Sequence, residues 1–183
     1  MRFSKTDLHL VYLIDPEPHI DKRGSFSRIF CRQENAANGA SMEVVQVNRS
    51  MNSAAGTMRG LHFQTVPACE TKRVTCIRGR VFDIILDIRK GSPTFLQWIG
   101  IELSEENKKM VHIPTGCAHG FQTLEPNTEL LYFHSAPFSA DHYKGIRYDD
   151  PRVNVHLPLN VTHISQRDAN FPLLGSEFDG FSP

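Results

Sequence analysis

Two histidines lie in segments whose residue types and spacing could support acid–base chemistry. His62 stands in the segment RGLHFQ, where alternation along a strand would place His62 and Gln64 on one face and Arg59 on the other. His119 follows a turn in the segment PTGCAHGF. A histidine without a bound metal titrates near neutrality, which suits a general base. A structural, hydrogen-bonded histidine is the alternative interpretation at both positions.

The spacing P-x-G-x-x-H around His119 resembles the second sequence motif of cupins, which are small jelly-roll β-barrels. A metal-binding cupin supplies His-x-His and then a glutamate in its first motif. Here Gln64 stands where the second histidine would be, and Glu70 lies beyond a turn that contains proline. A neutral amide is a poor ligand for transition metals. We therefore expect no metal ion, and a polar pocket that is left free for acid–base chemistry.

Lys72 is a further candidate, because it opens the segment KRVTCIR, in which Lys72 and Val74 would share one face of a strand. Taken alone, this pattern favours a solvated lysine. Two other kinds of site find no support in the sequence. The chain contains neither a glycine-rich phosphate loop (GxGxxG or GxxxxGKS/T) nor a GxSxG nucleophile elbow.

Short strands must carry these residues, and turns rich in glycine and proline separate them. The strands expected from the apolar patterns are residues 9–14, 25–30, 43–48, 72–78, 80–88, 95–103, 109–113, 119–124 and 128–134. Such regular spacing is typical of a sandwich or barrel. We expect short helices at residues 33–37 and 104–108, the second with Ser104 as its N-cap. The sequence therefore predicts an all-β jelly-roll barrel of the cupin type with short peripheral helices.

Composition limits the function further. The chain has 183 residues, 40% of them apolar and 22% charged, and residues 1–183 are expected to form one domain. Twenty basic and twenty acidic side chains cancel, which argues against a nucleic-acid-binding protein. No apolar stretch approaches the roughly 20 residues of a membrane-spanning helix, and no signal-peptide pattern opens the chain. Four scattered cysteines without a CxxC pair favour reduced thiols in a cytoplasmic protein.

Seven segments resemble one protein family in the same order. They are residues 59–64, 72–74, 79–83, 87–95, 97–98, 103–108 and 114–121. From about residue 21 to residue 168 the chain is similar to the dTDP-4-dehydrorhamnose 3,5-epimerase family. The resemblance implies an isomerase on a cupin barrel. It would epimerise a nucleoside-diphosphate 4-keto-6-deoxyhexose at C3, C5 or both, without a cofactor, in deoxysugar biosynthesis.

The chemistry of such a reaction defines the groups that it needs. A C4 ketone acidifies the hydrogens at C3 and C5, because the anion delocalises onto the ketone oxygen. Inversion then requires a base on one face, a stabilising charge at the oxygen and an acid on the other face. His62 suits the base and Lys72 the stabilising charge. The resemblance implies that Asp168 is the carboxylate partner of His62 and that Tyr132 is the acid.

The resemblance also implies how the nucleotide is bound. Arg23 and Arg59 match positions near the diphosphate, for which a guanidinium is well suited, and Phe26 matches an aromatic ring that stacks on the base. Family members form homodimers in which N-terminal strands cross to the partner, so Arg23 and Phe26 would serve the neighbouring site. The remaining candidates for contact with the substrate are Gln46, Asn48, Gln64, Asp83 and His119, with Asp83 expected to hold the Lys72 ammonium in place.

Two positions depart from the family pattern. Arg28 stands where a glutamate is common, and an arginine can only donate where that glutamate would accept from thymine. A CDP-4-keto-deoxysugar is therefore an alternative substrate, although Arg28 could equally point to solvent. Phe138 stands where a tyrosine is frequent, so inversion of a single centre is a further alternative. The sequence also leaves open a sugar-nucleotide 3,4-ketoisomerase, a non-catalytic sugar-nucleotide-binding protein and a metal-dependent cupin.

Overall fold

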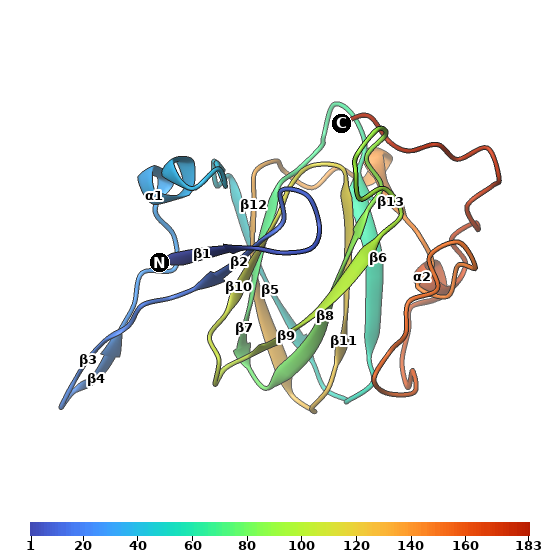
Figure 1. Ribbon diagram of the computed structural model, residues 1–183. Coiled ribbons are helices and arrows are strands. Elements are labelled where there is room, and N and C mark those ends of the chain that lie inside the picture. Colours follow the sequence, from blue (N-terminus) through green and yellow to red (C-terminus); the bar gives the residue numbers. More distant parts are fainter.

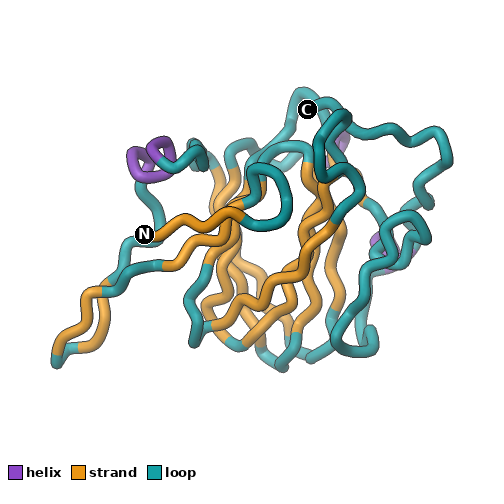
Figure 2. Tube along the Cα trace, in the orientation of Figure 1, coloured by secondary structure: helices purple, strands orange, loops and turns teal.

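The computed structural model describes all 183 residues, and two antiparallel sheets face each other across its interior (Figure 1, Figure 2). One sheet has six strands in the order β1-β2-β10-β7-β12-β5, and the other has five in the order β13-β6-β11-β8-β9. The strands are β1 (Arg2–Lys5), β2 (Tyr12–Asp15), β3 (His19–Asp21), β4 (Gly24–Phe26), β5 (Gln46–Asn52), β6 (Met58–Gln64), β7 (Lys72–Arg78), β8 (Arg80–Asp87), β9 (Trp98–Ser104), β10 (Met110–Ile113), β11 (Cys117–Thr123), β12 (Thr128–His134) and β13 (Tyr143–Gly145). The all-β expectation is confirmed.

Alternation along the strands divides the apolar side chains into two cores. A cluster of 12 buried residues lies between the sheets and includes Val74, Ile85 and Leu130. A second cluster of nine, with Ile84 and Leu86, lies on the other face of the five-stranded sheet. The segment after β13 covers this outer face (Figure 1). Burial of each such aliphatic side chain contributes about 1.5–3 kcal/mol to the stability of the fold. Both cores therefore hold in place the strands that carry the polar side chains between the sheets.

The helical elements are short and lie at the edges. They are α1 (Arg32–Ala37), the 3₁₀ turn η1 (Ala140–His142) and α2 (Gln166–Ala169). The helix expected at residues 33–37 is confirmed. The helix expected at residues 104–108 is wrong, because those residues form a turn in which Ser104 and Asn107 each accept the other's backbone N–H. These side-chain bonds offer the backbone an alternative to a helix. No helix of the chain is long and apolar enough to cross a membrane.

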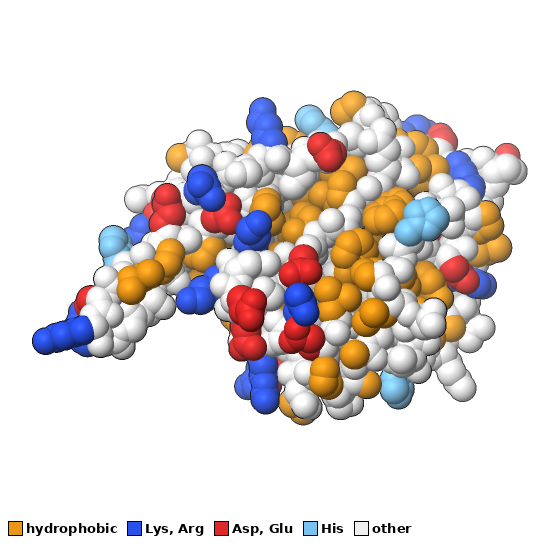
Figure 3. Space-filling model, turned by 60° about the horizontal axis from the view of Figure 1, so that its bottom comes forward, with side chains coloured by type: hydrophobic (Ala, Val, Ile, Leu, Met, Phe, Trp, Pro, Cys, Tyr) orange, Lys and Arg blue, Asp and Glu red, His pale blue; other side chains and the backbone are white.

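A hairpin of β3 and β4 extends away from the body of the molecule (Figure 2). Basic side chains form its tip, and an apolar patch lies along it (Figure 3). Ile20 and Phe26 are 77% and 76% exposed on this hairpin. The strand expected over residues 25–30 ends at Phe26, so Arg28 lies beyond it. A pair of strands cannot bury side chains without a further layer, and within one chain this hairpin has none.

Candidate active site

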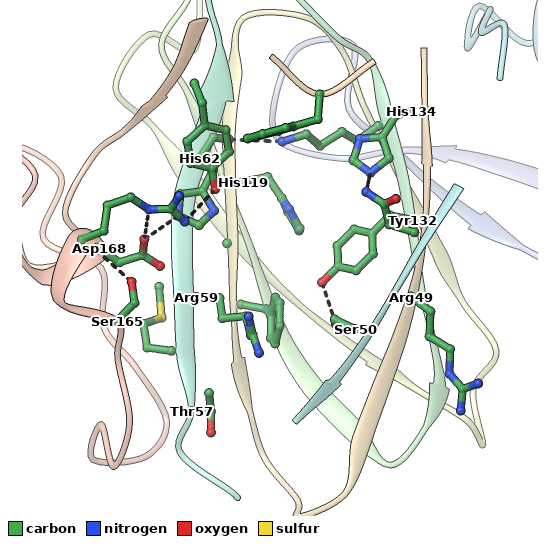
Figure 4. A pocket seen from close by; sticks show the side chains of 18 of the residues that line it. Arg49, Ser50, Thr57, Arg59, His62, His119, Tyr132, His134, Ser165 and Asp168 are labelled. Atoms are coloured by element: carbon green, nitrogen blue, oxygen red, sulfur yellow. Dashed lines mark hydrogen bonds and ion pairs between the residues drawn. The ribbon is translucent and has the colours of Figure 1, made fainter. Parts of the chain in front are cut away.

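A cavity of about 530 Å³ opens between the two sheets. β5 and β12 form one wall, β6 and β11 form the opposite wall, and the start of α2 closes one side (Figure 4). The predicted site residues that line this cavity are Gln46, Asn48, Arg59, His62, Lys72, His119, Tyr132, Phe138 and Asp168. The predicted residues that do not line it are Arg23, Phe26, Arg28, Gln64 and Asp83.

A bulge in β6 sets the direction of its two functional side chains. His62 pairs with His119 and Arg59 pairs with Phe121, so three steps along β6 match two steps along β11. The extra residue turns Arg59 to the same side as His62, and both line the cavity. Strict alternation placed them on opposite faces, and that expectation is wrong.

Glycine is required at the bulge because the two backbones come close together. Gly60 has φ +106°, a conformation that side chains with a Cβ rarely adopt. A Cβ there would lie 2.6 Å from both the Cα of Gly120 and the carbonyl oxygen of His119. A Cβ on Gly120 would likewise lie 2.5 Å from the carbonyl oxygen of Arg59. The glycine pair therefore permits the geometry that turns Arg59 inward.

His62 and Asp168 form a hydrogen-bonded pair on this wall. The Nε2 atom of His62 lies 2.9 Å from Oδ1 of Asp168, and Oδ2 accepts the N–H of Gly60 at 3.0 Å. Asp168 is itself fixed, because its backbone N–H donates to the Ser165 side chain that caps α2. A carboxylate at Nε2 holds the hydrogen on that nitrogen, which leaves Nδ1 as the basic atom. Nδ1 has no hydrogen-bond partner within the chain.

The charges of this pair follow from burial and hydrogen bonding. Burial lowers the pKa of His62, against the opposing effect of its bond to Asp168. Burial would raise the pKa of Asp168, but the bonds from His62 and from the Gly60 N–H prevail and lower it to about 2. At neutral pH the ring is therefore neutral and the carboxylate is ionised. That combination is the one that a general base requires.

Tyr132 lies across the cavity from His62, on β12 (Figure 4). Its hydroxyl lies 3.2 Å from Oγ of Ser50. Burial raises the pKa of Tyr132 above its ordinary value of 10.0. The phenol therefore keeps its proton at neutral pH and can donate it.

Lys72 is buried beside the base, and its partner differs from the one expected. Its Nζ lies 3.0 Å from Oε1 of Glu70 and 3.4 Å from the carbonyl oxygen of His62. Asp83 instead lies 2.8 Å from Nε2 of His119. The expectation that Asp83 holds Lys72 is wrong. Glu70, two residues before Lys72 in the chain, takes that place.

Arg59 is placed to meet a ligand inside the cavity. Its Nε donates to Oδ1 of Asn52 at 2.7 Å, which fixes the side chain and leaves the terminal nitrogens of the fork free. A guanidinium held in this way matches the oxygens of a phosphate. Gln46 and Asn48, on β5, line the same cavity with amide groups, and Phe138 lies at its edge, 56% exposed.

Gln64 has a structural position in place of the expected contact with the substrate. Its Nε2 donates to the carbonyl oxygens of Ala68 and Pro137, and its Oε1 accepts the N–H of Ser139 at 2.6 Å. The hydrogen bonds of the amide therefore connect the loop at Ala68 with the loop at Pro137 and Ser139. Because the side chain is buried among backbone groups, it has no surface on the cavity.

The three predicted residues of the N-terminal region lie away from the cavity of their own chain. Arg23 pairs with Asp21 at the tip of the β3–β4 hairpin, and its side chain is 84% exposed. Phe26 is exposed on the same hairpin. Arg28 forms an ion pair with Glu34 of α1.

Several cavity residues are not evident from the sequence pattern. The ring of Tyr143 lies 4.9 Å from that of His62, and the guanidinium of Arg167 lies 4.6 Å from the Tyr143 ring centre. No sequence signal marks Tyr143, because β13 meets β6 from a distant part of the chain. Glu70 and His134 do carry a signal, since each is two residues from a predicted site residue on a strand or its extension.

No group of three or more His, Cys, Asp and Glu side chains is arranged to hold a metal ion. Three of the four histidines that line the cavity are instead each paired with one carboxylate: His62 with Asp168, His119 with Asp83 and His134 with Glu70. The fourth, His163, lies 3.1 Å from Oγ1 of Thr162.

Comparison with known proteins places this chain in a family. The family model described as dTDP-4-dehydrorhamnose 3,5-epimerase matches residues 5–176. A dTDP-4-dehydrorhamnose 3,5-epimerase from Sinorhizobium fredii is 41% identical over 95% of this chain and 90% of its own length. The chain belongs to the dTDP-4-dehydrorhamnose 3,5-epimerase family. It is an epimerase, of the isomerase class.

Solved structures of the dTDP-4-dehydrorhamnose 3,5-epimerase family agree with the fold. An enzyme of this name from Bacillus anthracis, with TDP and pyrophosphate bound, superposes with a TM-score of 0.91 at 36% identity, covering 94% of this chain and 99% of that one. A dTDP-6-deoxy-D-glucose-3,5-epimerase from Legionella pneumophila, in complex with dTDP-4-keto-L-rhamnose, gives 0.88 at 34% identity, covering 94% and 92%. The expected cupin-type barrel is confirmed. A dTDP-4-dehydrorhamnose 3-epimerase from Streptomyces niveus is also similar, 33% identical over 98% of this chain and 86% of its own length.

Proposed function

We propose that this protein epimerises a dTDP-4-keto-6-deoxyhexose at C3 and C5, with His62 as the base and Tyr132 as the acid. The observation that carries the proposal is their placement: a neutral histidine backed by an ionised Asp168 faces a protonated tyrosine across one cavity. A base and an acid on opposite walls are what inversion at a carbon requires. Residues 1–183 together form the domain that we assign to this activity.

The proposed reaction at each centre has two proton transfers. The hydrogen next to the ketone passes as a proton to Nδ1 of His62, and the electron pair of the C–H bond moves onto the C4 oxygen as an enolate. The Lys72 ammonium, which has three N–H donors, stabilises that oxygen. The enolate then returns its electron pair to the carbon, which takes a proton from the other face. At one centre this is the phenol proton of Tyr132, and the electron pair of the O–H bond stays on the oxygen. Solvent restores both groups to their starting protonation states.

The cavity suits a sugar nucleotide in size and charge. Its volume of about 530 Å³ lies within the range of about 300–1,000 Å³ that small-molecule sites occupy. Arg59 offers a guanidinium to the diphosphate, while Gln46 and Asn48 offer hydrogen bonds to the sugar or base. Solved relatives were crystallised with TDP or with dTDP-4-keto-L-rhamnose, which supports thymidine as the nucleoside.

We also propose a homodimer in which the β3–β4 hairpin completes the neighbouring site. The support is that Arg23 and Phe26 are exposed on a hairpin that extends away from their own cavity. Mixing tests this arrangement. A His62→Asn chain keeps an intact hairpin, and an Arg23→Ala, Phe26→Ala chain keeps an intact base. Each variant alone should have low epimerase activity, while mixed dimers of the two variants should recover activity. No recovery in proven mixed dimers would contradict the exchange.

The four free cysteines support a reducing, cytoplasmic location.

Inversion of one centre is the second candidate function. Phe138 lacks the hydroxyl that is frequent in the family, and a 3-epimerase is among the similar proteins. Incubating the enzyme with dTDP- and CDP-4-keto-6-deoxyglucose, followed by NMR of each product, separates the possible activities. We expect inversion at both carbons of the dTDP sugar. A preference for CDP would contradict the thymidine assignment, and a carbonyl moved to C3 would indicate a ketoisomerase.

A further inference from the structure

Another of the histidine–carboxylate pairs of the cavity joins His134, on the wall opposite His62, to Glu70. Oε2 of Glu70 lies 2.6 Å from Nδ1 of His134, and Oε1 of the same carboxylate lies 3.0 Å from Nζ of Lys72. All three side chains line the cavity and are largely buried. One carboxylate therefore holds both the ammonium assigned to the enolate oxygen and an imidazole beside it.

His134 shares a strand face with Tyr132. The two residues are two positions apart on β12, and their rings lie 6.0 Å apart with an angle of 21° between their planes. Across the sheet, His134 is in register with Lys72 of β7 and with Gln46 of β5. The wall that faces His62 thus presents two groups that can carry a proton, one beside the other (Figure 4).

Only one of the two ring nitrogens of His134 is bonded to a carboxylate. Nδ1 donates to Glu70, and Nε2 makes one long hydrogen-bond contact, 3.4 Å, with Nδ2 of Asn48. Burial would raise the pKa of Glu70, but its bonds to His134 and its proximity to Lys72 prevail and lower it. Glu70 is therefore ionised at neutral pH and can support a positively charged ring.

We propose that His134 is a second proton donor of the active site, so that the two carbons flanking the ketone are each served by a different donor, Tyr132 or His134. The inference rests on the proposed function and deepens it. Because Lys72 and His134 contact the same carboxylate, a ketone oxygen at Lys72 brings one neighbouring carbon near the ring. This second donor supplies a proton that Phe138, which has no hydroxyl, cannot supply.

The proton transfers at the carbon that His134 serves balance. His62 takes the carbon-bound proton at Nδ1, and the electron pair moves onto the ketone oxygen. The enolate carbon then forms a bond to the proton of Nε2, and the electron pair of that N–H bond stays on the ring. His134 becomes neutral imidazole and keeps its bond to Glu70. Solvent water then protonates Nε2 again, and His62 releases its proton to solvent.

The test follows each carbon separately in His134→Gln and Glu70→Gln variants. His9→Gln is the matched control, since His9 is exposed and lies outside the cavity. Each protein is incubated with dTDP-4-keto-6-deoxyglucose in D2O, and NMR measures inversion and deuterium uptake at C3 and at C5. Affinity for dTDP and the melting temperature are measured in parallel.

We expect His134→Gln to slow inversion at one centre by about 100-fold or more, the usual effect of removing a general acid, while the other centre keeps its rate. Glu70→Gln should slow the same centre by less, because its amide can still bond to the ring. Both variants should bind dTDP as the wild type does. If His134→Gln inverts both centres at the wild-type rates, the inference about His134 is overturned while the proposed function stands. An equal loss at both centres, together with lower dTDP affinity or melting temperature, would show a structural role and overturn it too. A wild type that exchanges neither hydrogen would instead overturn the proposed function.

Discussion

Replacing Asp168 with asparagine should disable the base without altering its shape. Oδ2 of Asp168 accepts the Gly60 N–H, while Oδ1 meets Nε2 of His62. Asparagine has one oxygen for these two places. If its NH2 faced Gly60, two donors would oppose each other in a buried site, at a cost of about 1–3 kcal/mol. The oxygen therefore faces Gly60 and the NH2 faces His62. Nε2 must then accept, and the hydrogen moves to Nδ1, the atom that should remove the proton.

The expected loss of activity is large. The same change in a Ser-His-Asp triad, which also enforces the wrong tautomer, lowers kcat by about 10⁴-fold. We expect about a 10³–10⁴-fold fall in kcat here, equivalent to about 4–5.5 kcal/mol of transition-state stabilisation. KM should change little, because Asp168 is 3% exposed and acts through His62.

The same substitution has a defined effect on stability. Lowering the pKa of Asp168 from 3.8 to about 2 corresponds to about 2 kcal/mol of stability at neutral pH. Because the pKa is lower in the folded state, this contribution is complete above about pH 5 and disappears as the pH falls to about 2. Asp168→Asn should therefore be less stable than the wild type at pH 7, and the gap should close in acid.

Steady-state kinetics and urea unfolding across pH test both statements, with the exposed Asp179→Asn as the control. A variant that retains more than a tenth of the wild-type kcat would refute the tautomer argument. An equal fall in kcat in the Asp179→Asn control would refute it as well.

Three further outcomes follow from the structure. Tyr132→Phe should keep hydrogen exchange but slow inversion at the carbon that Tyr132 serves by about 10²–10⁴-fold, since it removes that acid and leaves the base; exchange and inversion lost together at that carbon would argue against this division of roles. Gly60→Ala should destabilise the protein by more than about 1 kcal/mol, because its Cβ would lie 2.6 Å from Gly120 and from His119; thermal melting measures this, and an unchanged melting temperature would contradict it. Asp87→Asn should cost about 2 kcal/mol of stability, because bonds from Arg89 and two hydroxyls offset burial and lower the Asp87 pKa to about 2. Since Asp87 does not line the cavity, kcat should be kept in the folded fraction, and a selective loss of kcat would contradict that structural role.

The elements of the fold were largely predictable because their signals are local. Apolar alternation and turn residues predicted the strands at residues 72–78 and 128–134 with the bounds that the structure has. The turn at Ser104 was mistaken for a helix, because the same Ser and acidic pattern also suits an N-cap. The hairpin strand was predicted too long, since no packed layer extends it beyond Phe26.

The candidate site was predictable only in part. Alternation found the inward face of His62, and the family resemblance supplied Asp168 and Tyr132, which the structure brings into the same cavity. The inward turn of Arg59 depends on a bulge that arises from pairing with β11, so its own segment does not reveal it. Tyr143 likewise reaches His62 through a strand pairing between distant segments. Long-range register, rather than residue type, is what the sequence left undetermined.

The most direct test of the central claim concerns the removal of a carbon-bound proton by His62. Wild type and His62→Ala are each incubated in D2O with dTDP-4-keto-6-deoxyglucose, and mass spectrometry and NMR locate deuterium in the sugar. We expect deuterium at C3 and C5 with the wild type and none above background with His62→Ala, while dTDP binds both proteins alike. Deuterium uptake by His62→Ala at the wild-type rate would contradict the assignment of His62 as the base.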